Sequence, residues 1–311
     1  MNVLTAGEAL IDFTAEHASN GRLYRAQPGG SPFNVAIGLA RLGVDTGFLG
    51  CLSTDRFGER LREHLRDNRV DERCVCAQDA PSPLAFVYQG ESGDPAFSFY
   101  GDGTADALLA RADLPGAFES ELRAIHLGSI AMIRRPVGKT LSDLMLRESD
   151  RRVISFDPNV RPALMPERAV YLNQLDTWLR HVTLVKVSRA DLAWLHPDRD
   201  PMAIARSWLA MGPDWVVVTL GGDGALGAAP SGVVEVESPA VDVVDTVGAG
   251  DAFTAGLLAW LHDHDRLDRA LIATLTERDR RSALDFAVRV AAHTCTRRGA
   301  DPPTRDELAI G

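Results

Sequence analysis

The stretch DTVGAGDAFTAGLLAW, residues 245–260, constrains the fold of this chain more than any other. Apolar residues recur with helical spacing after Ala252, so we expect a helix that begins close to Gly250 or Asp251. The N–H groups in the first turn of a helix lack intrahelical partners and attract anions, and glycines before them let a phosphate reach the backbone.

Asp251 would then lie beside an anion site. A carboxylate placed there can remove the proton of a hydroxyl group, while the amides of Gly248, Ala249, Gly250 and Asp251 itself stabilise the charge on a transferring phosphoryl group. The simpler interpretation is that Asp251 only caps a core helix. The rest of the chain decides between the two.

A second stretch, QPGGSPFNVAIGLARLG at residues 27–43, predicts a tight turn that leads into a helix. Ser31 suits the N-cap, with a proline after it, and a glycine ends the stretch. Polar Asn34 comes one turn into the helix, beside Gly29 and Gly30, where its amide could donate to and accept from a sugar hydroxyl. A well-capped helix alone does not explain a polar side chain among these apolar neighbours.

Asp12 follows the first predicted strand, residues 3–9. Open α/β sheets bind ligands at the carboxyl ends of their strands, so Asp12 could accept hydrogen bonds from polyol hydroxyls. It could equally belong to a turn.

The composition excludes several classes of function. A net charge of -10 argues against nucleic acid or an anionic membrane surface as a general partner. The first residues show no basic leader and no stretch is long and apolar enough to cross a bilayer, so we expect a cytoplasmic protein. The spacing of Cys51, Cys74, Cys76 and Cys295 matches no zinc site, and we expect small apolar residues or surface thiols instead of a disulfide framework.

Together, GGSPFNVA at 29–36 and DTVGAGDAF at 245–253 resemble the paired signatures of the ribokinase-like (PfkB) carbohydrate kinase family. Segments similar to this family extend over essentially the whole chain. The resemblance implies a single α/β domain over residues 1–311, with three α/β/α layers and a mostly parallel central sheet. It also implies a small β-sheet lid, with strands inserted at about residues 10–27 and 84–101.

Two alternating runs at 84–88 and 96–100 predict a hairpin outside the main layers. Phe97 and Phe99 share one face of this hairpin, because side chains alternate along a strand. They could cover a bound sugar or simply pack the lid on the main domain.

Strands at 124–127 and 152–157 flank a helix at 136–147, a βαβ unit that implies a parallel sheet. Arg161 follows the second strand, where its guanidinium suits a carboxylate or paired oxygens, or a surface salt bridge. The pattern Asp-x-Asn-x-Arg, which includes Asn159, resembles fructokinases and 2-keto-3-deoxygluconate kinases more than ribokinases.

The resemblance also implies a nucleotide site. The family commonly has Asn-x-x-Glu where this chain has Ser188 and Asp191, so a Mg²⁺–phosphate water shell is expected there. Glycines at 222–227 match a dinucleotide-binding motif literally, but the following residues form strand patterns, so a Rossmann site is not expected. The residues implied near ATP are Lys186, Ser188, Asp191, Thr219, Gly221 and Gly224. Lys186 could instead extend from the sheet edge without binding ATP.

The C-terminal run TRRGA at 296–300 resembles fructokinases. By resemblance, a monovalent cation such as K⁺ would lie behind the anion site. Its ligands would be Asp245 and the carbonyl groups of Val247, Thr294, Arg297 and Gly299.

We therefore expect a kinase that transfers the γ-phosphoryl group of Mg-ATP to a primary hydroxyl of a small sugar, with fructose as the first choice. The sugar would lie between Asp12, Gly29, Gly30, Asn34, Asn159 and Arg161. Alternatives are 2-keto-3-deoxygluconate kinase, ribokinase, aminoimidazole riboside kinase or, in a different class, a catalytically silent sugar- or nucleotide-binding regulator. The expected partners are the sugar, ATP and, through the lid, a second copy of the chain.

Overall fold

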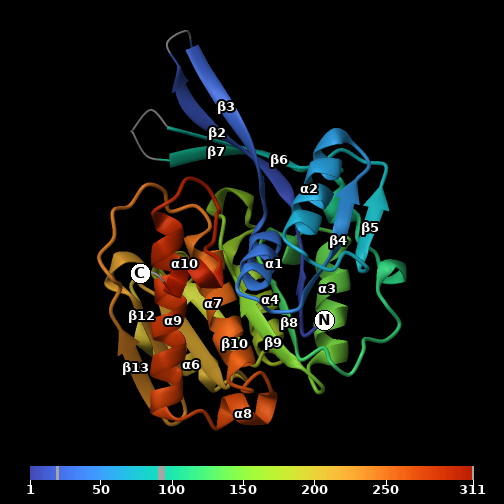
Figure 1. The fold of residues 1–311 in the computed structure, drawn as a ribbon. Helices are drawn as coiled ribbons and strands as arrows, with labels where there is room; N and C mark the ends of the chain where they lie inside the picture. The colour runs from blue at the N-terminus through green and yellow to red at the C-terminus, as the bar shows by residue number, and fades with distance from the viewer. Residues whose placement is uncertain (19–20, 90–94, 310–311) are drawn as a thin grey trace.

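The central sheet joins nine of the strands in a computed structural model that describes residues 1–18, 21–89 and 95–309 (Figure 1). Their order is β13-β12-β11-β10-β9-β8-β1-β4-β5. In this order, all neighbouring strands from β11 through β1 to β5 pair in parallel. Strands β12 and β13 add an antiparallel hairpin at the β11 edge. The strands are β1 (Val3–Ala6), β4 (Thr46–Ser53), β5 (Val75–Gln78), β8 (Ala124–Gly128), β9 (Val153–Asp157), β10 (Leu184–Ser188), β11 (Trp215–Thr219), β12 (Ala225–Ala229) and β13 (Gly232–Val236).

Helices cover both faces of this sheet, because its inner strands are apolar on both sides. Along β1, Val3 packs with one group of helices and Leu4 with the other. The first group is α1 (Ser31–Arg41), α7 (Ala249–Asp263) and α9 (Glu277–Cys295). The second is α3 (Val137–Glu148), α4 (Arg168–Leu179), α5 (Arg189–Leu195) and α6 (Pro201–Leu209). The predicted three-layer α/β/α architecture is confirmed.

A second sheet of four strands, in the order β3-β2-β6-β7, projects beyond these layers (Figure 1). It consists of β2 (Leu10–Ala18), β3 (Gly21–Gly29), β6 (Leu84–Gln89) and β7 (Pro95–Tyr100). The predicted hairpin is β6 and β7, and β2 joins it in parallel while pairing with β3 in the antiparallel direction. A separate apolar cluster, which includes Phe33, Phe48 and Leu61, supports this sheet from α1, β4 and α2 (Arg56–Asp67).

Two short α-helices, α8 (Arg269–Ala273) and α10 (Arg305–Ala309), complete the α-helices of the described ranges. Within the described ranges, every helix is too short or too polar to cross a bilayer.

Helix α1 begins differently from the prediction. Gly30 is its N-cap, and Ser31 is already its first residue. Gly30 has a φ of 106°, which strongly favours glycine, and a Cβ there would lie 2.5 Å from the carbonyl oxygen of Glu8. The Ser31 side chain is therefore free for another role.

The interpretation of the cysteines was wrong for Cys51 and Cys76, which form a disulfide. Strands β4 and β5 pair these two residues directly in register, with their Cα atoms 4.5 Å apart. The spacing along the chain gives no sign of this, because the register arises from tertiary pairing. Cys74 and Cys295 are free, as expected.

Candidate active site

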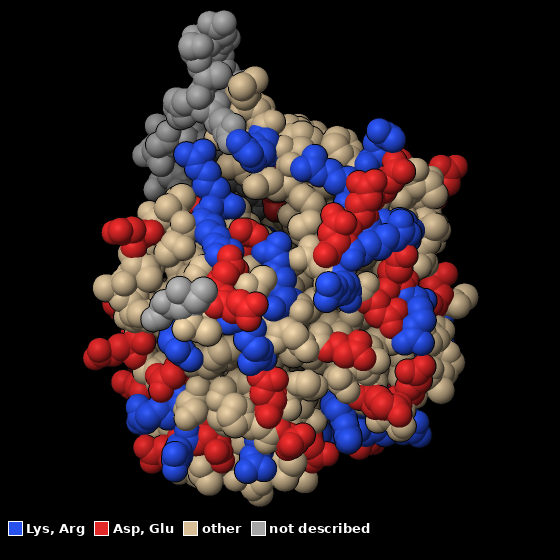
Figure 2. Space-filling view, in the orientation of Figure 1, with Lys and Arg blue, Asp and Glu red and all other residues tan. Residues whose placement is uncertain are grey.

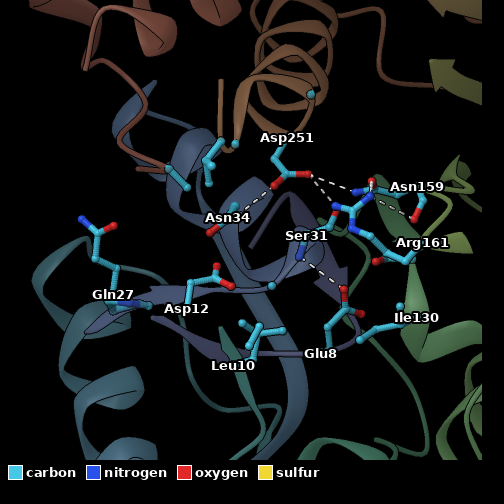
Figure 3. Close-up of a pocket in the computed structure, with 18 of the residues that line it drawn as sticks. Glu8, Leu10, Asp12, Gln27, Ser31, Asn34, Ile130, Asn159, Arg161 and Asp251 are labelled. Atoms are coloured by element: carbon cyan, nitrogen blue, oxygen red, sulfur yellow. Dashed lines mark hydrogen bonds between the residues drawn. The ribbon is translucent and has the colours of Figure 1, made fainter. Parts of the chain in front are cut away.

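A cavity of about 310 Å³ lies between the four-stranded sheet and the N-terminus of α7. The surface is hollowed below that sheet, on a face where acidic and basic side chains are interspersed (Figure 2). Of the residues expected at the sugar and at the reacting group, the cavity brings together Asp12, Gly30, Asn34, Phe99, Asn159, Arg161, Gly248, Gly250 and Asp251 (Figure 3).

Asp251 is the third residue of α7 and is 7% exposed. Its carboxylate accepts hydrogen bonds from Ser31 Oγ at 2.7 Å and Asn34 Nδ2 at 2.8 Å, and Asn159 Nδ2 lies 3.5 Å away (Figure 3). Burial raises the pKa of Asp251, and the hydrogen bonds together with the charge of Lys186 oppose this rise. A carboxylate that is oriented in this way and has a raised pKa can act as a general base.

The start of α7 has the features expected of an anion site. Gly248 has a left-handed φ of 77°, and a Cβ there would lie 2.5 Å from that of Ala300, so the turn requires glycine. The N–H of Ala249 donates to the carbonyl of Thr246. Among the described residues no acceptor takes the N–H of Gly250 or Asp251, which leaves these two first-turn donors for an anion.

The four-stranded sheet contributes Asp12 from β2. Burial raises the pKa of Asp12 to about 6, with Arg161 opposing the rise and Asp251 adding to it. Gly29 does not line the cavity, but a Cβ there would lie 2.1 Å from Asp12 Oδ2, so this glycine leaves room for the carboxylate. Phe99 lines the cavity and lies 5.5 Å below the Arg134 guanidinium, whereas the side chain of Phe97 lies outside the described part of the structure.

The segment after β9 faces the sheet across the cavity. Arg161 Nη1 donates to Asn159 Oδ1 at 2.6 Å, and Asn159 has a positive φ of 40°. The N–H of Asn159 in turn donates to Asp157 Oδ1, at the end of β9. These bonds orient Arg161 toward the cavity.

A second cavity, of about 460 Å³, adjoins the first. The predicted nucleotide residues Thr219, Gly221 and Gly224 line it. Thr246 and Gly250 line both cavities, which therefore meet at the start of α7.

Lys186, Ser188 and Asp191 do not line this second cavity. Lys186 is buried, with Nζ 2.8 Å from Asp157 Oδ2. Ser188 and Asp191 form the capping box of α5, and Asp191 also accepts from the N–H of Val160. Their expected contact with the nucleotide stays a prediction.

Asp245 contacts two of the other residues expected at the cation site, Val247 and Gly299, through their backbone N–H groups. One of its carboxylate oxygens accepts from the N–H of Val247 at 3.0 Å and the other from the N–H of Gly299 at 2.8 Å. The carbonyl of Thr294 accepts from the N–H of Arg297, whose side chain pairs with acidic groups of the C-terminal segment. A carboxylate with neighbouring carbonyl groups suits a hard cation.

Sequence reasoning missed two residues. The Ser31 side chain binds Asp251 instead of capping α1, and Glu8 is a buried carboxylate that lines the first cavity. An acidic residue inside the apolar stretch at residues 3–9 was the available signal for Glu8. The sequence held no signal for the bond between Ser31 and Asp251, because the two residues are 220 positions apart.

Known proteins resemble this chain along nearly all of its length. The family model described as pfkB family carbohydrate kinase matches residues 2–307. A fructokinase from Rhizobium leguminosarum bv. trifolii is 38% identical over 284 residues, which cover 91% of this chain and 86% of that protein.

Solved structures agree with this. A fructokinase from Xylella fastidiosa with bound ATP has a TM-score of 0.92 and 29% identity, covering 99% of this chain and 97% of that one. A double mutant of the fructokinase from Vibrio cholerae O395, with fructose, ADP and potassium ion bound, has a TM-score of 0.85 and 27% identity, covering 100% and 98%.

Proposed function

Because the chain belongs to the pfkB family of carbohydrate kinases, we propose that it transfers the γ-phosphoryl group of ATP to a primary hydroxyl of fructose. The observation that carries this proposal is the meeting of the two cavities at the start of α7, beside the buried carboxylate of Asp251. Relatives named fructokinase, one of them solved with fructose, support the choice of sugar.

In the proposed reaction the sugar occupies the first cavity, held by Asp12, Asn34, Asn159 and Arg161. Asp251 takes the proton from the primary hydroxyl as that oxygen attacks the γ-phosphorus, and the bond to the ADP oxygen breaks. Ser31 and Asn34 hold the carboxylate in place. The N–H groups at the start of α7 stabilise the negative charge that develops on the phosphoryl group.

ATP would lie in the second cavity, against Thr219, Gly221 and Gly224. The Mg²⁺ that accompanies ATP would neutralise charge on its phosphates. Ser188 and Asp191 are the residues we propose for the surrounding water shell. The relatives solved with ATP and with ADP support the use of this nucleotide.

A monovalent cation would add positive charge behind the anion site. We propose Asp245 and the carbonyls of Val247, Thr294, Arg297 and Gly299 as its ligands, and K⁺ as the ion, because a fructokinase of the same fold was solved with potassium.

ADP release tests the function directly. Purified protein is assayed with Mg-ATP and either fructose, ribose, 2-keto-3-deoxygluconate or aminoimidazole riboside, in K⁺ and in Na⁺. We expect kcat/KM for fructose to exceed the others and K⁺ to increase the rate. If another sugar has the highest value, the proposed substrate is wrong. If every sugar binds and none is turned over, the chain is a silent regulator.

Three further proposals concern organisation. We propose that residues 1–311 form one domain, that the protein acts in the cytoplasm, and that it forms a dimer through the four-stranded sheet. On the sheet face opposite the cavity, the rings of Tyr24 and Tyr100 each contact Phe86, although both tyrosines are more than a third exposed. Sedimentation of the wild type and of Tyr100→Ser tests the dimer, which the substitution should weaken.

A further inference from the structure

Glu8 is a buried carboxylate that the proposed reaction does not use. It follows β1, is 1% exposed and lines the first cavity. No lysine or arginine among the described residues pairs with it. Burying an unpaired carboxylate is costly, so its presence at this position calls for a role.

The Glu8 carboxylate joins two segments of the cavity wall. Oε1 accepts from the N–H of Ser31 at 3.3 Å (Figure 3). Oε2 accepts from the N–H of Ala131 at 3.2 Å. The Ser129 side chain lies beside the carboxylate and opposes the rise in its pKa. Ser31 is the first residue of α1, and Ser129 and Ala131 follow β8, so Glu8 links the start of that helix to the carboxyl ends of β1 and β8.

Ser31 connects this carboxylate to the base. Its backbone N–H binds Glu8, and its hydroxyl binds Asp251 Oδ1 at 2.7 Å. The position of the Ser31 backbone therefore decides whether its hydroxyl reaches Asp251.

We infer that Glu8 is a positioning residue that acts through Ser31 to fix the orientation and the protonation of Asp251. The inference rests on the proposed function only in taking Asp251 as the base. Glu8 contacts the Ser31 backbone and not Asp251 itself, so its effect on the base depends on the Ser31 hydroxyl.

The direction in which the pKa of Asp251 changes distinguishes a loss of positioning from a loss of charge at Glu8. A hydrogen bond from Ser31 lowers the pKa of Asp251, so its loss raises that pKa. Removing a negative charge from Glu8 would by itself lower the pKa of Asp251, but burial raises the pKa of Glu8 to about 7, so this charge is largely absent at lower pH. The other charged groups near Asp251 stay in place: Lys186 from β10, Asp157 from β9, and Asp12 and Arg161 in the cavity.

The test is a ¹³C NMR titration of protein labelled at the aspartate carboxyl carbons, with the Asp251 signal assigned by its loss in Asp251→Asn. We expect Glu8→Gln and Ser31→Ala each to raise the pKa of Asp251, and the double variant to raise it no further than the larger single change. An unchanged or lowered pKa in Glu8→Gln, or shifts that add in the double variant, would overturn the inference.

Kinetics give a second readout. We expect Glu8→Gln to reduce kcat roughly 10- to 100-fold, because small misplacements of a reacting group have effects of this order, and to leave KM for ATP within about twofold. In a Ser31→Ala background the same change should reduce kcat less than about threefold. Equal losses in both backgrounds would show that Glu8 does not act through Ser31.

Two further variants complete the design. Glu167→Gln, an exposed glutamate before α4, is the matched control and should change neither readout. If Glu8→Gln does not fold, Glu8→Asp keeps the carboxyl group but shortens the side chain, and it should still raise the pKa of Asp251. The titration needs no turnover. A protein that is inactive on every sugar would therefore contradict the proposed function, while the titration would still test the role of Glu8.

Discussion

Asn34 and Asp251 lie 217 positions apart in the sequence, and their side chains are joined by a hydrogen bond of 2.8 Å. Each comes from one of the two segments that resemble the family signatures. The bond places the start of α1 directly against the start of α7, so the residues expected to hold the sugar and to remove its proton form one unit.

Removing the base should abolish most of the turnover. Asp251→Asn keeps the shape of the side chain but cannot take a proton, so we expect a folded protein whose kcat falls by roughly 10²- to 10⁴-fold. Asp150→Asn, at a side chain that is 98% exposed, is the control. Steady-state kinetics with matched circular dichroism spectra provide the check, and a folded Asp251→Asn protein with normal kcat would refute the mechanism.

Arg161 should act on the sugar and not on the nucleotide. Its guanidinium lines the first cavity and is held by Asn159, so Arg161→Ala should raise KM for the sugar roughly 10-fold or more, as expected for a lost charge-assisted hydrogen bond. KM for ATP should stay near its original value. Arg56→Ala, at a side chain that is 94% exposed, serves for comparison. A change confined to KM for ATP would mean that Arg161 is misassigned.

Two lysine–aspartate pairs with the same 2.8 Å separation should differ in their effect on stability. The Lys186–Asp157 pair is buried, so Lys186→Met leaves a buried charge and should lower the free energy of unfolding by about 3–5 kcal/mol. The Lys139–Asp143 pair is exposed, so Lys139→Met should cost less than about 1 kcal/mol. Urea denaturation measures both. If Lys186→Met keeps its stability and only weakens ATP binding, the original nucleotide assignment of Lys186 is correct.

The stability of the protein should carry a pH signature from Glu8. Burial raises the pKa of Glu8 from 4.5 to about 7, so the folded state binds this proton more tightly than the unfolded state. The stabilisation is complete below pH 4.5 and is lost as the pH rises to about 7, a change of about 3 kcal/mol.

Urea unfolding of the wild type and of Glu8→Gln at pH 5 and pH 8 measures this signature. The free energy of the wild type relative to the variant should fall between the two pH values. A difference that stays constant or grows would show that the pKa of Glu8 is not raised.

Thiol counting tests the pairing of the cysteines. Without reductant, denatured protein should show two reactive thiols, those of Cys74 and Cys295, and after reduction it should show four. Cys51→Ser should leave Cys76 reactive as well. Four reactive thiols before reduction would contradict the disulfide.

Local patterns predicted the elements and the main site well. The glycines before Ala252 and the helical spacing after it located the start of α7 to within about two residues. The alternation of apolar and polar residues along 84–88 and 96–100 predicted β6 and β7, because successive side chains of a strand point to opposite faces.

What could not be predicted depends on contacts between distant segments. Ser31 has a good N-cap sequence, but the backbone of Gly30 takes the cap position, and the serine hydroxyl turns to Asp251. Ser188 and Asp191 match a nucleotide motif in spacing, yet the same spacing also forms a capping box. Tertiary packing determines side-chain partners of this kind, and a short stretch of sequence carries no information about that packing.

Strand β3 ends at Gly29 and α1 begins at Ser31, so one glycine separates the small sheet from the helix that orients the base. A rigid rotation of the sheet must therefore be absorbed at Gly30 or passed to Ser31 and Asn34. Any movement of the sheet would therefore also act on the hydrogen bonds that already hold the base. The small sheet and the base are thus coupled through a single residue.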